Sequence, residues 1–99
     1  MGLIKNKNPN AHWLENYGFK YKPIPVAGYF PGYERVYHHE GGSECLWVNV
    51  CFSKRVVFLY NEYWCGGFLW ERKLIIPSEI CESDEEKFID WLDEELNIN

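Results

Sequence analysis

The strongest constraint on the fold is a series of four short segments in which apolar and polar side chains alternate. They are YERVYHHE (33–40), ECLWVNVCF (44–52), RVVFLYN (55–61) and FLWERKLII (68–76), and the links between them are two to six residues long. Runs rich in β-branched and aromatic residues between turn residues are typical of strands. Links this short join antiparallel neighbours, so the sequence predicts a four-stranded antiparallel β-meander.

Segment 44–52 shows what each face of that sheet carries, because successive side chains of a strand point to opposite faces. One face receives Leu46, Val48, Val50 and Phe52, and the other receives Cys45, Trp47, Asn49 and Cys51. We predict that the first face is the core and that the second mixes aromatic with polar side chains.

Helices are predicted at both ends of the meander. The segment NPNAHWLENYGFK begins with Asn10 as a helix cap and stops at Gly18, which indicates a helix of two turns at most. A capping-box pattern, Ser83 with Glu86, introduces a helix from about Asp84 to Leu96. Its apolar side chains Phe88, Ile89, Leu92 and Leu96 fall within one arc, which we expect to dock on the sheet. The predicted fold class is α+β, with a short N-terminal helix and an acidic C-terminal helix packed on the sheet.

Length and composition set limits on the class of protein. A chain of 99 residues is expected to form one domain, residues 1–99, and 46% hydrophobic residues exclude a disordered chain. No stretch approaches the roughly 18 apolar residues of a membrane helix, and MGLIKNKNPN lacks the apolar core of a signal peptide. We therefore expect a cytoplasmic protein with no membrane partner. The four cysteines lack the spacing of a zinc site, so buried free thiols, no metal and no cofactor are expected.

Charge is distributed unevenly along the chain. The formal net charge is −5, and residues 78–99 hold nine of the 15 acidic residues but only one of the ten basic ones. Asp93 and Glu94 fall at the C-terminal end of the predicted helix, the negative end of its dipole, where each carboxylate is unfavourable by a few tenths to about 1 kcal/mol. The four-residue spacing of Glu86, Asp90 and Glu94 adds repulsion between like charges.

Two explanations of the acidic helix remain open at this stage. The first is a solvated face that keeps an aromatic-rich protein soluble. The second is a surface, formed by Glu86, Asp90, Asp93 and Glu94, that docks on a basic partner protein such as the nucleic-acid channel of an enzyme. The same charges argue against nucleic acid itself as the ligand, because they would repel its phosphates.

Aromatic residues are unusually dense in the hairpin LYNEYWCGGFLWERK (59–73). Its rings point to both faces, so a single core layer cannot bury all of them. Tyr63, Trp64 and Trp70 are therefore candidate interface anchors, and Tyr37, Trp47 and Arg72 are further candidates for partial exposure. Three alternatives remain open: a sheet that rolls over its own core, a homodimer through this face, and a site where sugars stack on the rings.

Candidate catalytic groups are sparse. His38, His39 and Glu40 lie near Cys45, but adjacent strand residues point to opposite faces, so only one histidine can serve a given site. Glu62 and Glu71 bracket the aromatic turn without any further catalytic pattern. No nucleophile elbow, phosphate loop or helical histidine pair is present in the sequence. We predict that the protein is not an enzyme.

The segments WLENYGF (13–19), LWVNVCF (46–52), VVFLYNEYWCGGFLWERKLIIP (56–77) and EEKFIDWLDEEL (85–96) together resemble small acidic accessory proteins of phages and mobile elements. These include anti-CRISPR proteins and other inhibitors of host defence. The resemblance is one of size and layout and carries no site residue over. It implies a compact acidic protein that binds a partner and does no chemistry.

The function predicted from the sequence is therefore a non-enzymatic inhibitor that binds and blocks a partner protein, such as a CRISPR nuclease. Asp90, Asp93 and Glu94 would attract the partner, and Trp64 or Trp70 would anchor it. The alternatives are an immunity protein that neutralises a toxin and a module that binds a glycan or small ligand through the aromatic face.

Overall fold

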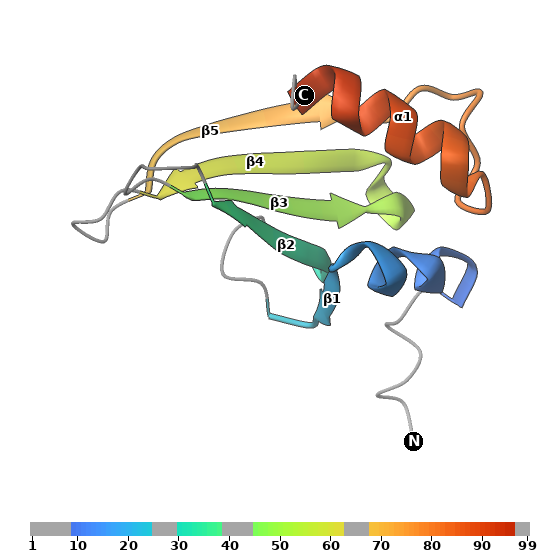
Figure 1. Cartoon of the computed structure of the whole chain (residues 1–99), viewed down its shortest axis with the longest axis horizontal. Coiled ribbons are helices and arrows are strands. Elements are labelled where there is room, and N and C mark those ends of the chain that lie inside the picture. Colours follow the sequence, from blue (N-terminus) through green and yellow to red (C-terminus); the bar gives the residue numbers. More distant parts are fainter. Residues whose placement is uncertain (1–8, 25–29, 39–44, 63–67, 97–99) are drawn as a thin grey trace.

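The computed structural model of the chain describes residues 9–24, 30–38, 45–62 and 68–96, without the side chains of residues 9, 10 and 68–71 (Figure 1). In chain order the elements are η2 (Pro9–Tyr17), β1 (Lys20–Lys22), β2 (Gly32–His38), β3 (Cys45–Cys51), η3 (Phe52–Lys54), β4 (Val56–Glu62), β5 (Phe68–Ile75) and α1 (Glu85–Leu96). The strands form one sheet in the order β1-β2-β3-β4-β5, and every neighbouring pair is antiparallel. The predicted α+β class and the antiparallel meander are confirmed.

The predicted number of four strands is wrong, because β1 adds a fifth. This strand precedes the predicted meander and pairs Lys20 with Glu34 and Lys22 with Gly32. Gly18, with φ of 89°, turns the chain out of η2 and directs it along β2. Three residues between a helix end and a proline show too little alternation to predict a strand from sequence.

The predicted N-terminal helix is present, but η2 is a 3-10 helix. Ala11 and Leu14 are fully buried, and Tyr17 packs against the same core. Residues three apart lie in line along a 3-10 helix, so this spacing gives η2 one continuous edge against the sheet.

Both helices contribute to the core on one face of the sheet, which we call the helix face. Figure 1 shows them at the same end of the sheet, α1 beside β5 and η2 beside β1. Val48, Val50 and Phe52 are buried on the helix face and Leu46 packs at its margin, as predicted. The other side, here called the second face, carries a smaller cluster of Cys51, Val56, Phe58 and Tyr60, with Phe30 and Trp47 packed against it.

Helix α1 docks through the predicted apolar arc. Phe88 and Leu92 are fully buried, while Ile89 and Leu96 are partly buried against the same core. The start of the helix differs from the prediction by one residue.

Asp84 accepts the Phe88 N–H at its backbone oxygen at 2.9 Å, and its carboxylate accepts the Cys81 N–H at 2.8 Å. Asp84 is therefore at the N-cap position of α1, and its carboxylate is bonded to the turn that precedes the helix. The predicted capping box is wrong, because Ser83 lies one residue too early to reach the first free amides of the helix.

Gly32 brings the backbone of β2 very close to β3. A Cβ atom at this position would lie 2.5 Å from the Val50 backbone oxygen and 2.9 Å from Asn49 Oδ1. Asn49 is itself fully buried on the second face, and its Nδ2 donates to Glu34 Oε2 at 3.2 Å. Only a residue without a side chain fits between these groups.

We expect Gly32→Ala to lower the free energy of unfolding by about 1–3 kcal/mol, the usual cost of overpacking a filled site. Urea denaturation measures the change. Lys20→Ala, at an exposed position of the paired strand, is the control and should change stability by no more than about 0.5 kcal/mol. An alanine variant as stable as the unchanged protein would show that β2 and β3 do not approach so closely.

Candidate functional site

The outward side of α1 carries a row of carboxylates, as the sequence predicted. Glu86, Asp90, Asp93 and Glu94 are all exposed, and we call these four residues the acidic face. They project from α1 because Phe88 and Leu92 fix the opposite side of the helix against the sheet. Acids fill the first turn of α1, and no basic residue lies in the last turn to offset the helix dipole.

Basic side chains of the same protein neutralise little of the negative charge on α1. Arg72 Nη2 lies 3.6 Å from Glu95 Oε1, but both side chains are substantially exposed, at 45% and 39%, so this contact is screened by water and contributes little. Within the described part of the chain, no residue of the acidic face forms an ion pair.

Tyr17, Arg35 and Tyr37, here called the tyrosine–arginine strip, lie next to this acidic face. Arg35 links the two tyrosines: its Nη1 donates to the Tyr17 backbone oxygen at 2.8 Å, and its guanidinium carbon lies 4.2 Å from the Tyr37 ring centre. All three side chains are neither fully buried nor fully exposed. Tyrosine and arginine are enriched among residues that dominate the energy of protein interfaces.

Carboxylates of α1 contribute to the raised pKa values of both tyrosines of this strip. A hydrogen bond to the Glu85 carboxylate is the largest cause that raises the pKa of Tyr17, and the charges of Glu86 and Asp90 add to it. Burial is the main cause that raises the pKa of Tyr37; the Asp93 charge adds to the increase and Arg35 opposes it. The helix carboxylates and the strip therefore form neighbouring parts of one surface.

The predicted aromatic anchors cannot be placed. Tyr63 and Trp64 lie outside the described residues, and for Trp70 only the backbone, within β5, is described. Their role stays a prediction. Tyr17 and Arg35 did not emerge from the sequence, because neither belongs to an aromatic cluster and only the fold brings them beside α1.

The further candidates for an exposed aromatic face lie on different sides of the sheet. Strand pairing puts Tyr37 and Arg72 on the helix face and Trp47 on the second face. Trp47 Nε1 donates to Glu62 Oε1 at 2.6 Å, which places a carboxylate on the second face. All three side chains are at least partly exposed, as expected, but they do not share one face.

One pair among the candidate catalytic residues does come together. His38 faces Cys45 across β2 and β3, and Cys45 Sγ lies 3.3 Å from His38 Nδ1. His39 and Glu40 lie outside the described residues, and of Glu71 only the backbone is described.

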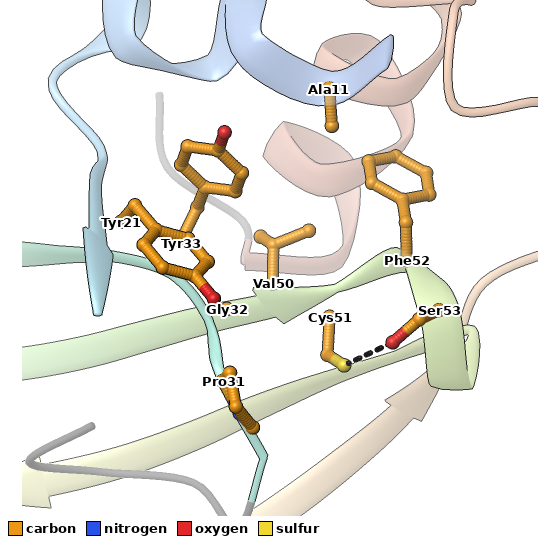
Figure 2. Close-up of a pocket in the computed structure, with 9 residues that line it drawn as sticks. All are labelled: Ala11, Tyr21, Pro31, Gly32, Tyr33, Val50, Cys51, Phe52 and Ser53. Atoms are coloured by element: carbon orange, nitrogen blue, oxygen red, sulfur yellow. Dashed lines mark hydrogen bonds between the residues drawn. The ribbon is translucent and has the colours of Figure 1, made fainter. Parts of the chain in front are cut away.

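Two concavities among the described residues differ in size. Figure 2 shows a small cavity where Val50 and Phe52 point towards η2 and Ala11. Its volume of about 40 Å³ suits a water molecule or two, far below the roughly 300 Å³ at which ligand pockets begin. An open hollow of about 460 Å³ lies along β1, lined by Glu15, Gly18, Phe19, Lys20 and Tyr21. Of the two aromatic residues that line the hollow, Phe19 is buried and Tyr21 is half-buried.

The described ranges contain no group of three or more His, Cys, Asp or Glu side chains arranged to hold a metal ion. Cys45, Cys51 and Cys81 are free thiols, but the expectation that they are buried holds for Cys51 alone among these three, because Cys45 is half-buried and Cys81 is exposed. None of the helices in these ranges has the length and apolar character needed to cross a membrane. No protein-family model matches the chain, and comparison with characterised proteins and with solved structures found no similar protein.

The raised pKa values of Tyr17 and Tyr37 predict a loss of stability at alkaline pH. The unfolded chain ionises its tyrosines near the usual pKa of 10.0, before the folded chain does. This contribution to stability is complete below that pH and falls as the pH rises above it. Urea denaturation at pH values on both sides of 10.0 should show the fall.

Tyr37→Phe should make that fall shallower, because it removes one of the ionising groups. Asp93→Asn should act in the same direction, since it removes a charge that raises the Tyr37 pKa. Lys20→Ala is the control and should leave the pH dependence of the unchanged protein intact. A Tyr37→Phe variant with the same pH dependence as the unchanged protein would contradict the coupling.

Proposed function

We propose that this protein binds and blocks another protein that presents a basic surface, and that it does so without catalysis. The observation that carries the proposal is the acidic face of α1. Its four carboxylates are exposed and form no ion pair within the described part of the chain. They would attract basic groups of a partner and steer its approach.

The placement of these acids favours recognition over architecture. Asp93 and Glu94 lie in the last turn of α1, where the helix dipole disfavours each carboxylate by a few tenths to about 1 kcal/mol. The repeat of Glu86, Asp90 and Glu94 at four-residue spacing adds repulsion along the helix. Lysine at Asp93 or Glu94 would make α1 more stable. A solubilising surface requires charge, but it does not require negative charge at this end of a helix.

The tyrosine–arginine strip supports a protein partner in preference to a free polyelectrolyte. Arg35 is held by the Tyr17 backbone and stacks on Tyr37, so the strip is ordered before a partner arrives. Ordered side chains lose less conformational entropy on binding. The acidic face would supply attraction and orientation, while Tyr37 and Arg35 would supply close contact. The predicted anchors Trp64 and Trp70 would extend that contact.

The partner class we propose is a nuclease of bacterial host defence, such as a CRISPR nuclease. Enzymes of this class hold nucleic acid in a positively charged channel. A row of carboxylates on a rigid helix can occupy part of such a channel in place of phosphates. An immunity protein that covers the basic active site of a toxin would use the same surface, and the identity of the captured protein separates the two.

The combined variant Asp90→Asn, Asp93→Asn, Glu94→Gln tests the role of the acidic face. It keeps side-chain size and removes three negative charges. We expect thermal stability to be equal or slightly higher, by a few tenths of a kcal/mol for each repulsion relieved. We expect capture of the partner from host-cell lysate, followed by mass spectrometry, to be lost. Inhibition of the purified partner by the unchanged protein should saturate at one inhibitor per enzyme.

Matched single variants control for a general change in charge. Asp93→Asn removes one charge from the acidic face, and Glu79→Gln removes one from an exposed acid in the turn before α1. The first should weaken capture and the second should not. Equal capture by the unchanged protein and the combined variant would remove α1 from the mechanism.

A further inference from the structure

Strand pairing forms a row of three reactive side chains on the second face of the sheet. His38 of β2 faces Cys45 of β3, and Cys45 in turn faces Glu62 of β4. The row lies at the end of the sheet where β3 begins, on the left in Figure 1 and away from the helices. It has no part in the proposed function, which uses the other face.

The geometry within the row couples a thiol to a base. Cys45 Sγ lies 3.3 Å from His38 Nδ1, within hydrogen-bonding distance for sulfur. His38 is exposed and Cys45 is half-buried, so both groups are open to small molecules. An imidazole at this distance can accept the thiol proton, and the thiolate is the nucleophilic form of cysteine.

Glu62 places a carboxylate on the side of Cys45 that faces away from His38. Its Oε1 accepts a hydrogen bond from Trp47 Nε1 at 2.6 Å, which holds the carboxylate on the second face.

The other two described cysteines provide a comparison within the same molecule. Cys51 is buried, and its Sγ lies 3.3 Å from the Ser53 hydroxyl, which is not a base (Figure 2). Cys81 is exposed, and no side-chain partner of its sulfur is found among the described residues. Cys45 therefore combines access with a base, while each of the others lacks one of the two.

We propose that Cys45 and His38 form a nucleophilic pair that accepts a thiol modification from low-molecular-weight disulfides such as oxidised glutathione. His38 Nδ1 takes the proton from Cys45, and the Cys45 sulfur attacks one sulfur of the disulfide. A new S–S bond to Cys45 forms as the old one breaks. The leaving thiolate takes the proton from His38. Cys45 is thereby oxidised to a mixed disulfide, and the departing half of the reagent is reduced to a thiol.

The size of the effect follows from how little thiolate an ordinary cysteine carries. A free cysteine is only a few per cent ionised at neutral pH, so full ionisation raises its rate by at most a few tens of fold, and a more acidic thiol is also less nucleophilic. We expect Cys45 to react about tenfold faster than Cys81.

The experiment exposes the whole protein to excess oxidised glutathione and follows each cysteine by peptide mass spectrometry. All variants carry Cys65→Ser, because Cys65 lies outside the described residues. Cys45 should react about tenfold faster than Cys81, and His38→Gln should bring it close to the Cys81 rate. His12→Gln is the matched control: it removes an exposed histidine paired with Glu15 and should leave the Cys45 rate unchanged.

Cys51 reports on folding during the same measurement, since it should stay unmodified while the sheet is intact. Equal rates at Cys45 and Cys81, with Cys51 protected, would overturn the proposal. So would a Cys45 rate that His38→Gln leaves unchanged. A variant in which Cys51 becomes modified has lost its intact sheet. In that case the modification rates of Cys45 and Cys81 are compared in the Cys65→Ser protein and in its His12→Gln variant, and these rates decide whether Cys45 reacts faster.

Discussion

Burial of Phe88 and Leu92 in the core determines the orientation of α1. The positions of the acidic face and of the tyrosine–arginine strip relative to each other depend on that orientation. Both side chains are fully buried, and burial of each is worth about 1.5–3 kcal/mol. An adverse helix-dipole contact costs a few tenths to about 1 kcal/mol. Packing therefore outweighs the unfavourable placement of any one acid, and α1 holds Asp93 and Glu94 outward although the helix dipole disfavours both.

Trp13 connects that helix to η2, which lies beside the opposite edge strand of the sheet (Figure 1). Its Nε1 donates to the Glu82 backbone oxygen at 2.8 Å, and its ring makes edge contacts with Phe52 and Phe88. These contacts hold η2 near the start of α1, which brings Tyr17 and the rest of the tyrosine–arginine strip beside the acidic face. The two parts of the proposed interface thus come from separate segments of the chain. The second face is chemically independent and carries the cysteine and histidine pair.

The sequence predicted those features that follow from a regular period. The alternation in 44–52 identified the core face, and the spacing of Phe88 and Leu92 identified the buried side of α1. It missed β1, whose three residues form a strand only because β2 offers them an edge. It also missed Arg35, because nothing local marks an arginine that the fold will stack on Tyr37.

Among the site residues, those placed by helical geometry could be predicted from the sequence, and those placed by strand pairing could not. The exposure of Asp90 and Asp93 follows from helical geometry and could be predicted. The contact of His38 with Cys45 depends on the register between two strands, which the sequence did not specify. Trp64 and Trp70 were chosen as anchors because of their residue type, and their side chains lie outside the described part of the chain.

In the proposed function α1 recognises its partner by charge, and this recognition can be tested directly. Its most direct test is the affinity for the purified partner, measured by calorimetry over a series of salt concentrations. Salt screens exposed charges within about 10 Å at 0.1 M ionic strength, so the affinity should fall steeply as salt rises. A combined Asp90→Asn, Asp93→Asn, Glu94→Gln variant should bind weakly and with a much smaller salt dependence. Tight binding that salt leaves unchanged would contradict recognition through the acidic face.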